Sequence, residues 1–335
     1  MQESETVKIV APSLSAVVVA TSNFESIART VRHLHAQTVR DQIELILVVP
    51  SRSAIEVEDK ELEGFAVVEW IELGTISDVD QAAGPGLQKG TAPIVVAVED
   101  HAFPDPNWAE QLIEAHKGSC AAVGTAMENA NPGGGFSWAN LMLNYGKWGA
   151  DDLGARVIDA LPGHNIAYKR SLLIPYENHV DEWLGRSSTL HGDLQAAGHD
   201  LFFLPQAKLA HVNPSKPSVT MVIRFRSGRL YGATRRREGN WSLGLRLVYV
   251  LGSPLIPFMQ FPPIARNAKR CGRAGKLLAC MPAMAVCLLA AAMGEAYGYL
   301  FGPGKVAEQL AGMEFERFRQ LRLADFKDLP DLPRP

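Results

Sequence analysis

Three polar side chains that can bind a metal ion directly follow an apolar run in this sequence. The run is "APIVVAV" at 92–98, and Glu99, Asp100 and His101 come next. Carboxylates and an imidazole can hold a divalent cation, which neutralises phosphate oxygens and helps a diphosphate to leave. An acidic strand end can equally be an ordinary cap or turn, and the triplet alone leaves both interpretations open.

The triplet ends a predicted strand of an α/β sheet. Apolar, β-rich runs at 14–20, 43–49 and 64–73 predict further strands, and helical spacing at 25–37 completes a βαβ unit with parallel strands. Nearly continuous apolar strands are typical of a sheet covered on both faces, with ligands at the carboxyl ends of the strands. We therefore expect the triplet to face a ligand.

The next part of the chain continues the α/β pattern. We expect a short helix or loop at 77–91, a helix at 105–118, a strand at 120–127, a glycine-rich loop and amphipathic helix within 129–148, a helix at about 187–197, and a strand that ends at His211. The lone histidines His33, His35 and His116 are expected on helix surfaces.

Composition limits the possible partners and compartments. The 335 residues carry a net charge of −3, which gives no indication of a nucleic-acid partner. The four cysteines form no CxxC pair, so we expect free buried thiols in a reducing compartment. The stretch "MQESETVKIV" lacks the basic-then-apolar order of a signal peptide, which favours a cytoplasmic first domain.

The last third of the chain is basic and apolar. Residues 224–246 hold seven arginines and one glutamate, and uncharged stretches follow at 247–264 and 277–294. The first stretch contains four prolines, which favours a re-entrant or interfacial segment, whereas the second is the better candidate for a membrane span. Basic flanks suit anionic lipids on the cytoplasmic side. Burial of both stretches in a soluble helical domain is the alternative.

These patterns predict three regions: an α/β domain at 1–215, a basic and hydrophobic, membrane-associated helical region at 216–304, and an amphipathic tail at 305–335.

The order of several segments resembles family 2 glycosyltransferases of the GT-A fold. These segments are "SAVVVATSNFESIARTVRHLHAQ", "IELILVV", "GTAPIVVAVEDHAFPDPNW", "LPGHNIAYKRSLL" and "LQAAGHDLFFLPQAKLAHV", which together cover roughly residues 13–212. In that family a DxD-like motif ends a strand and is followed by a proline pair and a tryptophan. Here Glu99, Asp100 and His101 occupy the motif positions, and Trp108 matches its continuation.

The resemblance implies a GT-A-like nucleotide-binding sheet and an enzyme that transfers a sugar from a nucleotide-sugar donor with inversion, usually with Mn²⁺ or Mg²⁺. It implies Asp100, His101 and His211 as metal ligands. For His211, a phosphate contact or a buried structural histidine is the alternative. The substrate-binding positions that it implies are Thr21, Asn23, Glu99, His164 and Asn165. We add Trp138, which follows a glycine-rich loop and could stack on a sugar ring; a plain surface loop is the alternative.

The donor side of the site departs from the family pattern in two places. Glu99 and His101 replace the outer aspartates of the motif, and the imidazole favours Mn²⁺ over Mg²⁺. Pro50 and Ser51 stand where the family has an acidic residue after the second strand. Nucleotide binding is therefore expected to depend more on the first loop.

The catalytic base is the third departure. The family's "ED" pair would open the helix before Leu190, but the sequence reads Arg186, Ser187 and Ser188 there. Serine is a poor base near neutral pH, so we predict Asp181 or Glu182, about one helical turn upstream, as the base. The alternative is that both are surface charges.

The leading hypothesis is an inverting glycosyltransferase that associates with membrane lipids at the cytoplasmic face and acts on a lipid-linked or saccharide acceptor. The alternative is a catalytically silent relative that binds a sugar nucleotide or glycolipid and serves as a membrane partner. A nucleotidyltransferase can share the α/β layout, but the first strand lacks a nearby glycine- and lysine-rich loop.

Overall fold

The computed structural model describes residues 11–179, 187–315 and 317–330, and it divides into two compact units. Unit 1 comprises Met1–Thr125, Ala155–Leu209 and Leu332–Pro335, and unit 2 comprises Ala126–Gly154 and Ala210–Asp331. The predicted domain at 1–215 thus includes a segment, 126–154, that the structure groups with the C-terminal helices.

Unit 1 is built on a mixed sheet with the strand order β3-β2-β1-β4-β8-β6-β9-β5, and β7 pairs with β9 outside this order. β3, β2, β1 and β4 are parallel, whereas β8 is antiparallel to β4 and β6. The strands are β1 Leu14–Val19, β2 Ile43–Val49, β3 Val67–Glu72, β4 Ile94–Val98, β5 Ala102–Pro104, β6 Ala122–Asn129, β7 Arg156–Val157, β8 Ala167–Lys169 and β9 Leu201–His211. All the strands that the sequence predicts are present.

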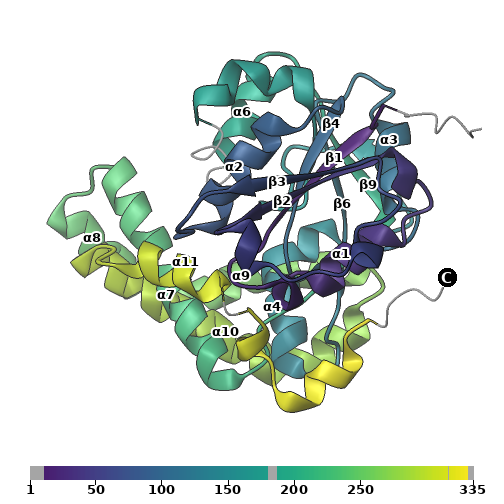
Figure 1. Cartoon of the computed structure of the whole chain (residues 1–335). Coiled ribbons are helices and arrows are strands. Elements are labelled where there is room, and N and C mark those ends of the chain that lie inside the picture. Colours follow the sequence, from purple (N-terminus) through teal and green to yellow (C-terminus); the bar gives the residue numbers. More distant parts are fainter. Residues whose placement is uncertain (1–10, 180–186, 316, 331–335) are drawn as a thin grey trace, which may run out of the picture. The chain divides into compact units, whose positions relative to one another are not determined.

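Helices cover the sheet, which confirms the predicted α/β class (Figure 1). They are α1 Ala28–His35, α2 Val79–Lys89, α3 Trp108–Ala115 and α6 Ser187–Ala196. α2 and α6 pack on one face, where Val17 and Val48 of the strands share a core with Leu87 and Leu194 of the helices. α1 lies on the opposite face. Its apolar residues recur at helical spacing, which gives it one side to bury against the sheet.

The strand order reverses at β1, which lies between β2 and β4. β1 connects through α1 to β2 on one side, and the chain later returns to place β4 on the other side. A reversal of this kind leaves a crevice at the carboxyl ends of the two strands. The register pairs Val18 with Val98, so the loop after β1 and the turn after β4 leave the same edge of the sheet.

Two of the three lone histidines are buried, so their predicted place on helix surfaces is wrong. His33 is 5% exposed; its Nδ1 lies 3.2 Å from the Pro104 carbonyl oxygen, and its ring stacks on Phe103. His116 is 6% exposed, with Nδ1 2.9 Å from the Leu112 carbonyl oxygen. In each ring one nitrogen lies within hydrogen-bond distance of a backbone carbonyl oxygen, which lowers the free-energy cost of burying the neutral imidazole.

Unit 2 is mainly helical, as predicted for the C-terminal part of the chain. Its helices are α4 Gly135–Tyr145, α7 Pro217–Glu238, α8 Leu243–Gly252, α9 Ile256–Arg270, α10 Ala274–Phe301 and α11 Val306–Glu314. α4, α9 and the first half of α10 share one apolar core, which includes Met142, Ile264, Met284 and Cys287. The helical segment Leu243–Arg270, which comprises α8, a 3₁₀ turn and α9, is long and apolar enough to cross a membrane, and so is α10.

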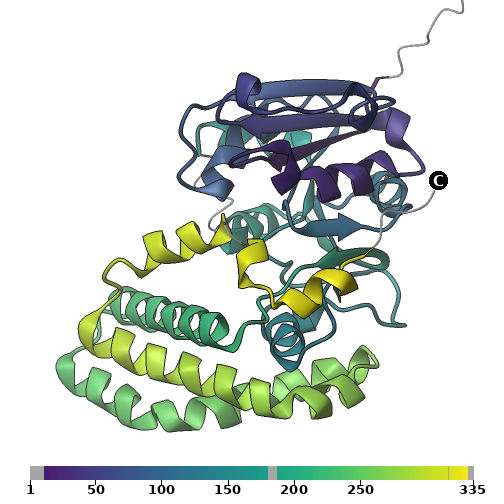
Figure 2. The same cartoon turned by 60° about the horizontal axis from the view of Figure 1, so that its bottom comes forward.

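α7 and α10 run side by side and in parallel (Figure 2). Glycines on both helices make the contact: a Cβ at Gly228 or Gly232 of α7 would collide with the backbone of α10, and one at Gly294 or Gly298 of α10 would collide with the backbone of α7. Small residues four positions apart allow two helix backbones to approach this closely. The helix pair therefore depends on the absence of side chains at these positions.

Adding a methyl group at this crossing should destabilise unit 2. We expect Gly228→Ala and Gly294→Ala each to lower the free energy of unfolding by roughly 1–3 kcal/mol, because the backbones must separate. In helix α11, a Cβ at Gly312 would meet open space, so Gly312→Ala should raise it by up to about 1 kcal/mol. Urea unfolding measures all three, and stabilisation by all three would contradict the close crossing.

Candidate functional site

The turn after β4 carries the predicted triplet and is fixed from α1. Thr30, a fully buried residue of α1, lies with its hydroxyl 2.8 Å from the Asp100 carbonyl oxygen and 3.1 Å from that of Ala102. Thr30 therefore holds the backbone of the turn. Glu99 and Asp100 stay partly accessible, with 12% and 16% of their side chains exposed.

The three side chains of the triplet interact with one another. The Asp100 carboxylate lies 2.6 Å from His101 Nδ1, and since a carboxylate only accepts, the ring donates its proton from Nδ1. Nε2 lies 3.7 Å from a carboxylate oxygen of Glu99, and in the neutral ring it would carry the lone pair. Asp100 thus orients the imidazole, as carboxylates do behind many metal-binding histidines.

Asn165 holds Glu99 from the loop before β8. Its side-chain oxygen accepts from the Glu99 backbone N–H at 3.0 Å, and its amide group donates to the Glu99 carboxylate at 2.6 Å. The Asn165 backbone is left-handed, with φ of 57°, a conformation that asparagine tolerates better than most residues. The side chain and backbone of Asn165 therefore both fix the position of this carboxylate.

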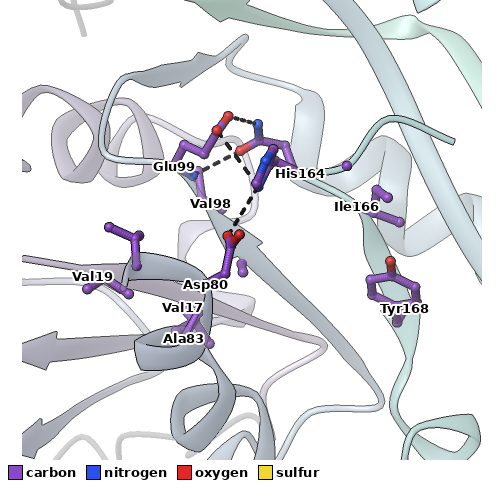
Figure 3. A pocket seen from close by; sticks show the side chains of 13 residues that line it. Val17, Val19, Asp80, Ala83, Val98, Glu99, His164, Ile166 and Tyr168 are labelled. Atoms are coloured by element: carbon purple, nitrogen blue, oxygen red, sulfur yellow. Dashed lines mark hydrogen bonds and ion pairs between the residues drawn. The ribbon is translucent and has the colours of Figure 1, made fainter. Parts of the chain in front are cut away.

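His164 lies between two carboxylates, as Figure 3 shows. Its Nδ1 is 3.4 Å from an oxygen of Asp80 and 3.9 Å from an oxygen of Glu99. Asp80 belongs to the first turn of α2, whose N-cap is Asp78. Asp80 is not among the predicted site residues, because nothing in the sequence places it near His164.

A cavity lies beneath these polar groups and has an apolar wall (Figure 3). Its lining comes from the ends of β1 and β4, from α2 and from the segment leading into β8, and includes Val17, Val19, Ala83, Val98, Ile166 and Tyr168. The Tyr168 hydroxyl lies 3.0 Å from Nε2 of the buried His191 on α6. Its volume of about 40 Å³ is far below the roughly 300–1,000 Å³ of a small-molecule pocket, so the cavity can hold only part of a ligand.

Burial sets the protonation of this tyrosine–histidine pair. It lowers the pKa of His191 to about 4 and raises the pKa of Tyr168 well above its usual range. At neutral pH both groups are therefore uncharged. The sequence does not reveal the pair, because its two members are far apart in the chain and meet only in the folded structure.

Three further predicted site residues lie at or just after the ends of strands. Thr21 and Asn23 follow β1 at the edge of the sheet where Glu99 lies, and Asn23 caps a short 3₁₀ helix by accepting from the Ser26 N–H at 3.2 Å. His211 is the last residue of β9 and belongs to unit 2.

Trp138 lies in α4 of unit 2, where its indole N–H donates to the Pro132 carbonyl oxygen at 2.9 Å and Lys276 lies over its ring. Its ring thus already has partners, and stacking on a sugar stays a prediction. Asp181 and Glu182 lie outside the described residues.

Comparisons with known proteins add a structural likeness. No protein-family model matches the chain, and no curated protein matches it. Among solved structures, the chain is similar to one described as the crystal structure of GalNAc-T7 with UDP, GalNAc and Mn²⁺, with a TM-score of 0.46 and 16% sequence identity. The match covers 60% of this chain and 43% of that chain, less than half of its length.

The donor set at the strand end has the chemistry of a divalent-cation site. Glu99 and His101 belong to a group of side chains able to hold a metal ion. Carboxylate oxygens combined with an imidazole nitrogen suit Mn²⁺ or similar metals, whereas Mg²⁺ prefers oxygen ligands. The side chains in place therefore fit the predicted cation, with Glu99 facing His101 Nε2 and Asp100 bound to Nδ1.

Removing the Asn165 side chain should release Glu99 without straining the backbone. We expect Asn165→Gly to weaken Mn²⁺ binding, followed by electron paramagnetic resonance, and to lower the free energy of unfolding by roughly 1–3 kcal/mol. Asn240 also has a positive φ, 46°, but is exposed, so Asn240→Gly is the matched control and should be nearly neutral. Equal effects of both substitutions would contradict the conclusion that the Asn165 side chain fixes Glu99.

Unit 1 should lose stability as the pH falls below neutrality. Burial lowers the pKa of both His33 and His191 to about 4, so protons bind the unfolded chain more readily between pH 6.5 and 4. Each histidine should take about 2 kcal/mol from the free energy of unfolding between pH 7 and pH 5. Denaturant unfolding at both pH values should show a smaller loss in His33→Gln and His191→Gln; an unchanged pH dependence would contradict the assignment.

Proposed function

We propose that the chain is a GT-A-type glycosyltransferase of family 2 character that moves a sugar from a nucleotide-sugar donor to a lipid-linked or saccharide acceptor, with inversion. The observation that carries the proposal is the polar cluster of Glu99, Asp100, His101, His164 and Asn165 at the strand-order reversal, next to an apolar-walled cavity. Nucleotide ligands characteristically bind at this point of an open α/β sheet.

The charges of the cluster favour a donor that arrives with a cation. Glu99, Asp80 and Asp100 bring three carboxylates close together, and these would repel a bare diphosphate. Mn²⁺ or Mg²⁺ held by His101 and the neighbouring carboxylates, with His211 as the further predicted ligand, would neutralise the leaving diphosphate. In this proposal Thr21, Asn23, His164 and Asn165 bind and orient the donor.

The proposed transfer needs one general base. The base takes the proton of the acceptor hydroxyl as its oxygen attacks the anomeric carbon, and the bond from that carbon to the nucleoside diphosphate breaks. Asp181 or Glu182 remains the predicted base. His191 does not serve this role in the conformation described, because it is buried and already bound to Tyr168.

We also propose that the enzyme works at the cytoplasmic face of a membrane and contacts its lipids. Residues 216–304 contain 13 lysines and arginines but two acidic residues, Glu238 and Glu295. Such an excess of positive charge beside apolar helices suits anionic lipid headgroups. This location would bring a lipid-linked acceptor within reach.

A panel of nucleotide sugars with Mn²⁺ tests the reaction, read as transfer to an acceptor or as donor hydrolysis. We expect turnover that falls at least about a hundredfold in His101→Gln and Glu99→Gln, because the cation loses a ligand. His199→Gln, a histidine of unit 1 outside the cluster, should keep normal turnover. Unchanged turnover in both site variants would contradict the assignment of Glu99 and His101 to a metal site.

The same assay separates an enzyme from a silent relative. Asp181→Asn or Glu182→Gln should abolish turnover while nucleotide still raises the melting temperature. If the unaltered protein is stabilised by a nucleotide sugar but turns over none of the panel, the chain is a binding protein instead.

A further inference from the structure

The apolar helices of unit 2 form a surface on which many large apolar side chains are exposed to solvent. The helix Leu243–Arg270 is largely exposed although it is apolar enough to cross a membrane. Its exposed large side chains are Leu243, Leu245, Leu247, Val248, Leu251, Leu255, Phe258 and Met259. An exposed apolar area of this extent marks a protein or membrane interaction site.

α10 has one apolar stripe that is exposed along its whole length. Leu278, Leu289, Met293, Tyr297 and Phe301 are exposed, at spacings that keep them on one side of the helix. The other side is buried along its whole length, in the first half against α4 and α9 and in the second half against α7. α10 therefore has the exposure pattern of a surface helix and not of a helix surrounded by lipid.

The partner of the second half is incompatible with hydrocarbon. α7 carries six arginines, at 224, 226, 229, 235, 236 and 237, and it meets α10 backbone to backbone. Arg224 is buried and hydrogen-bonded to Asn140 and Asn144 of α4. If α10 crossed a bilayer, it would either take these charges with it or lose the close glycine crossing, and both are unfavourable.

Both ends of α10 are fastened within unit 2. Before its first turn, Arg273 donates to the Met127 carbonyl oxygen at 2.9 Å and pairs with Glu128 at 2.7 Å. At its end, Arg229 donates to the Gly302 carbonyl oxygen at 2.8 Å, and Arg236 donates to that of Leu300 at 2.9 Å. These bonds hold the two ends of the helix on one folded body.

We propose that unit 2 binds one leaflet of a membrane through its apolar helices, with α8 and α9 in the interface, and that α10 does not cross. The occupant of the apolar surface is a bilayer with anionic headgroups, because exposed cations stand beside it. Arg266, Lys269 and Lys276 are exposed at the junction of α9 and α10, where Arg270 pairs with Asp151 at 3.2 Å. Apolar burial combined with lipid-facing cations is the usual basis of one-leaflet binding.

Three of the four prolines at 247–264 agree with such a surface. The helix Leu243–Arg270 is interrupted by a 3₁₀ turn at Ser253–Leu255, which contains Pro254. Pro262 and Pro263 lie inside α9 and remove backbone donors from its helical ladder. The carbonyl groups left without these donors can be solvated at a membrane interface, whereas hydrocarbon offers them nothing.

Sided labelling of the two ends of α10 tests the proposal on the full chain. Gly275→Cys and Lys305→Cys place exposed thiols in the first turn of α10 and after its end, in a Cys271→Ser background because Cys271 is the half-buried native thiol. In inside-out membrane vesicles from the expressing cells, a membrane-impermeant maleimide should label both positions equally. If one position labels only after detergent opens the vesicles, α10 crosses the membrane and the proposal is overturned.

Flotation with phosphatidylcholine vesicles, with or without phosphatidylglycerol, tests the surface itself. Leu251→Glu and Phe258→Glu should each weaken binding about tenfold or more, because a large apolar side chain is lost from the interface. Leu323 is 90% exposed in unit 2 outside the apolar helices, so Leu323→Glu should bind like the unaltered protein. Binding should also need phosphatidylglycerol and decrease with salt.

One-leaflet binding rests on the membrane association in the proposed function. The outcomes of these experiments nevertheless distinguish a failure of membrane binding from a failure of the transferase reaction. A protein that dimerises and does not float has its apolar surface covered by a second copy, which overturns the membrane proposal and leaves the transferase reaction to its own assay. A protein that floats, and whose thiols label from one side, but that turns over no nucleotide sugar retains the membrane proposal and loses the reaction.

Discussion

The pairing of β1 with its two parallel neighbours is the constraint on which unit 1 depends. At the amino end of the strands, the buried Glu44 of β2 accepts from the Ser15 hydroxyl of β1, and from the Thr91 N–H at 2.7 Å just before β4. A buried carboxylate is tolerable only when its oxygens are satisfied in this way, so the bonds fix the register of all three strands. At the carboxyl end, the same register brings the loop after β1 beside Glu99.

The two ends of these strands use carboxylates in opposite ways. Glu44 has its oxygens occupied by Ser15 and Thr91 and is 1% exposed, so it stabilises the sheet and has little access to a ligand. Glu99 is held by Asn165, but it also faces two imidazoles and the cavity. A carboxylate that is fixed in position yet still partly accessible is suited to binding a cation.

The sequence predicted the fold of unit 1 better than it predicted the site. Strands such as 43–49 were predictable because a continuous apolar run needs no distant partner to be recognised. Asp80, His191 and the burial of His33 were not, because each depends on a contact with a residue far away in the chain. His164 and Asn165 were selected through the family resemblance, and the structure brings both of them to Glu99.

The division of the chain shows the same limit. Residues 126–154 look in sequence like a continuation of the α/β pattern, and only packing places α4 in one core with α9 and α10. The local pattern gives the type of an element, but its partner depends on complementary surfaces elsewhere in the chain.

The composition of α10 alone is compatible with two interpretations. Its 28 residues satisfy the length and apolarity of a membrane span, and the same residues satisfy a helix packed on one side. What separates the two is the set of neighbours: Gly228 and Gly232 bring an arginine-rich helix to backbone contact, and Arg224 links that helix to the asparagines of α4. Because a bilayer could not solvate that partner, the glycines and arginines of α7 decide what the apolar residues of α10 can do.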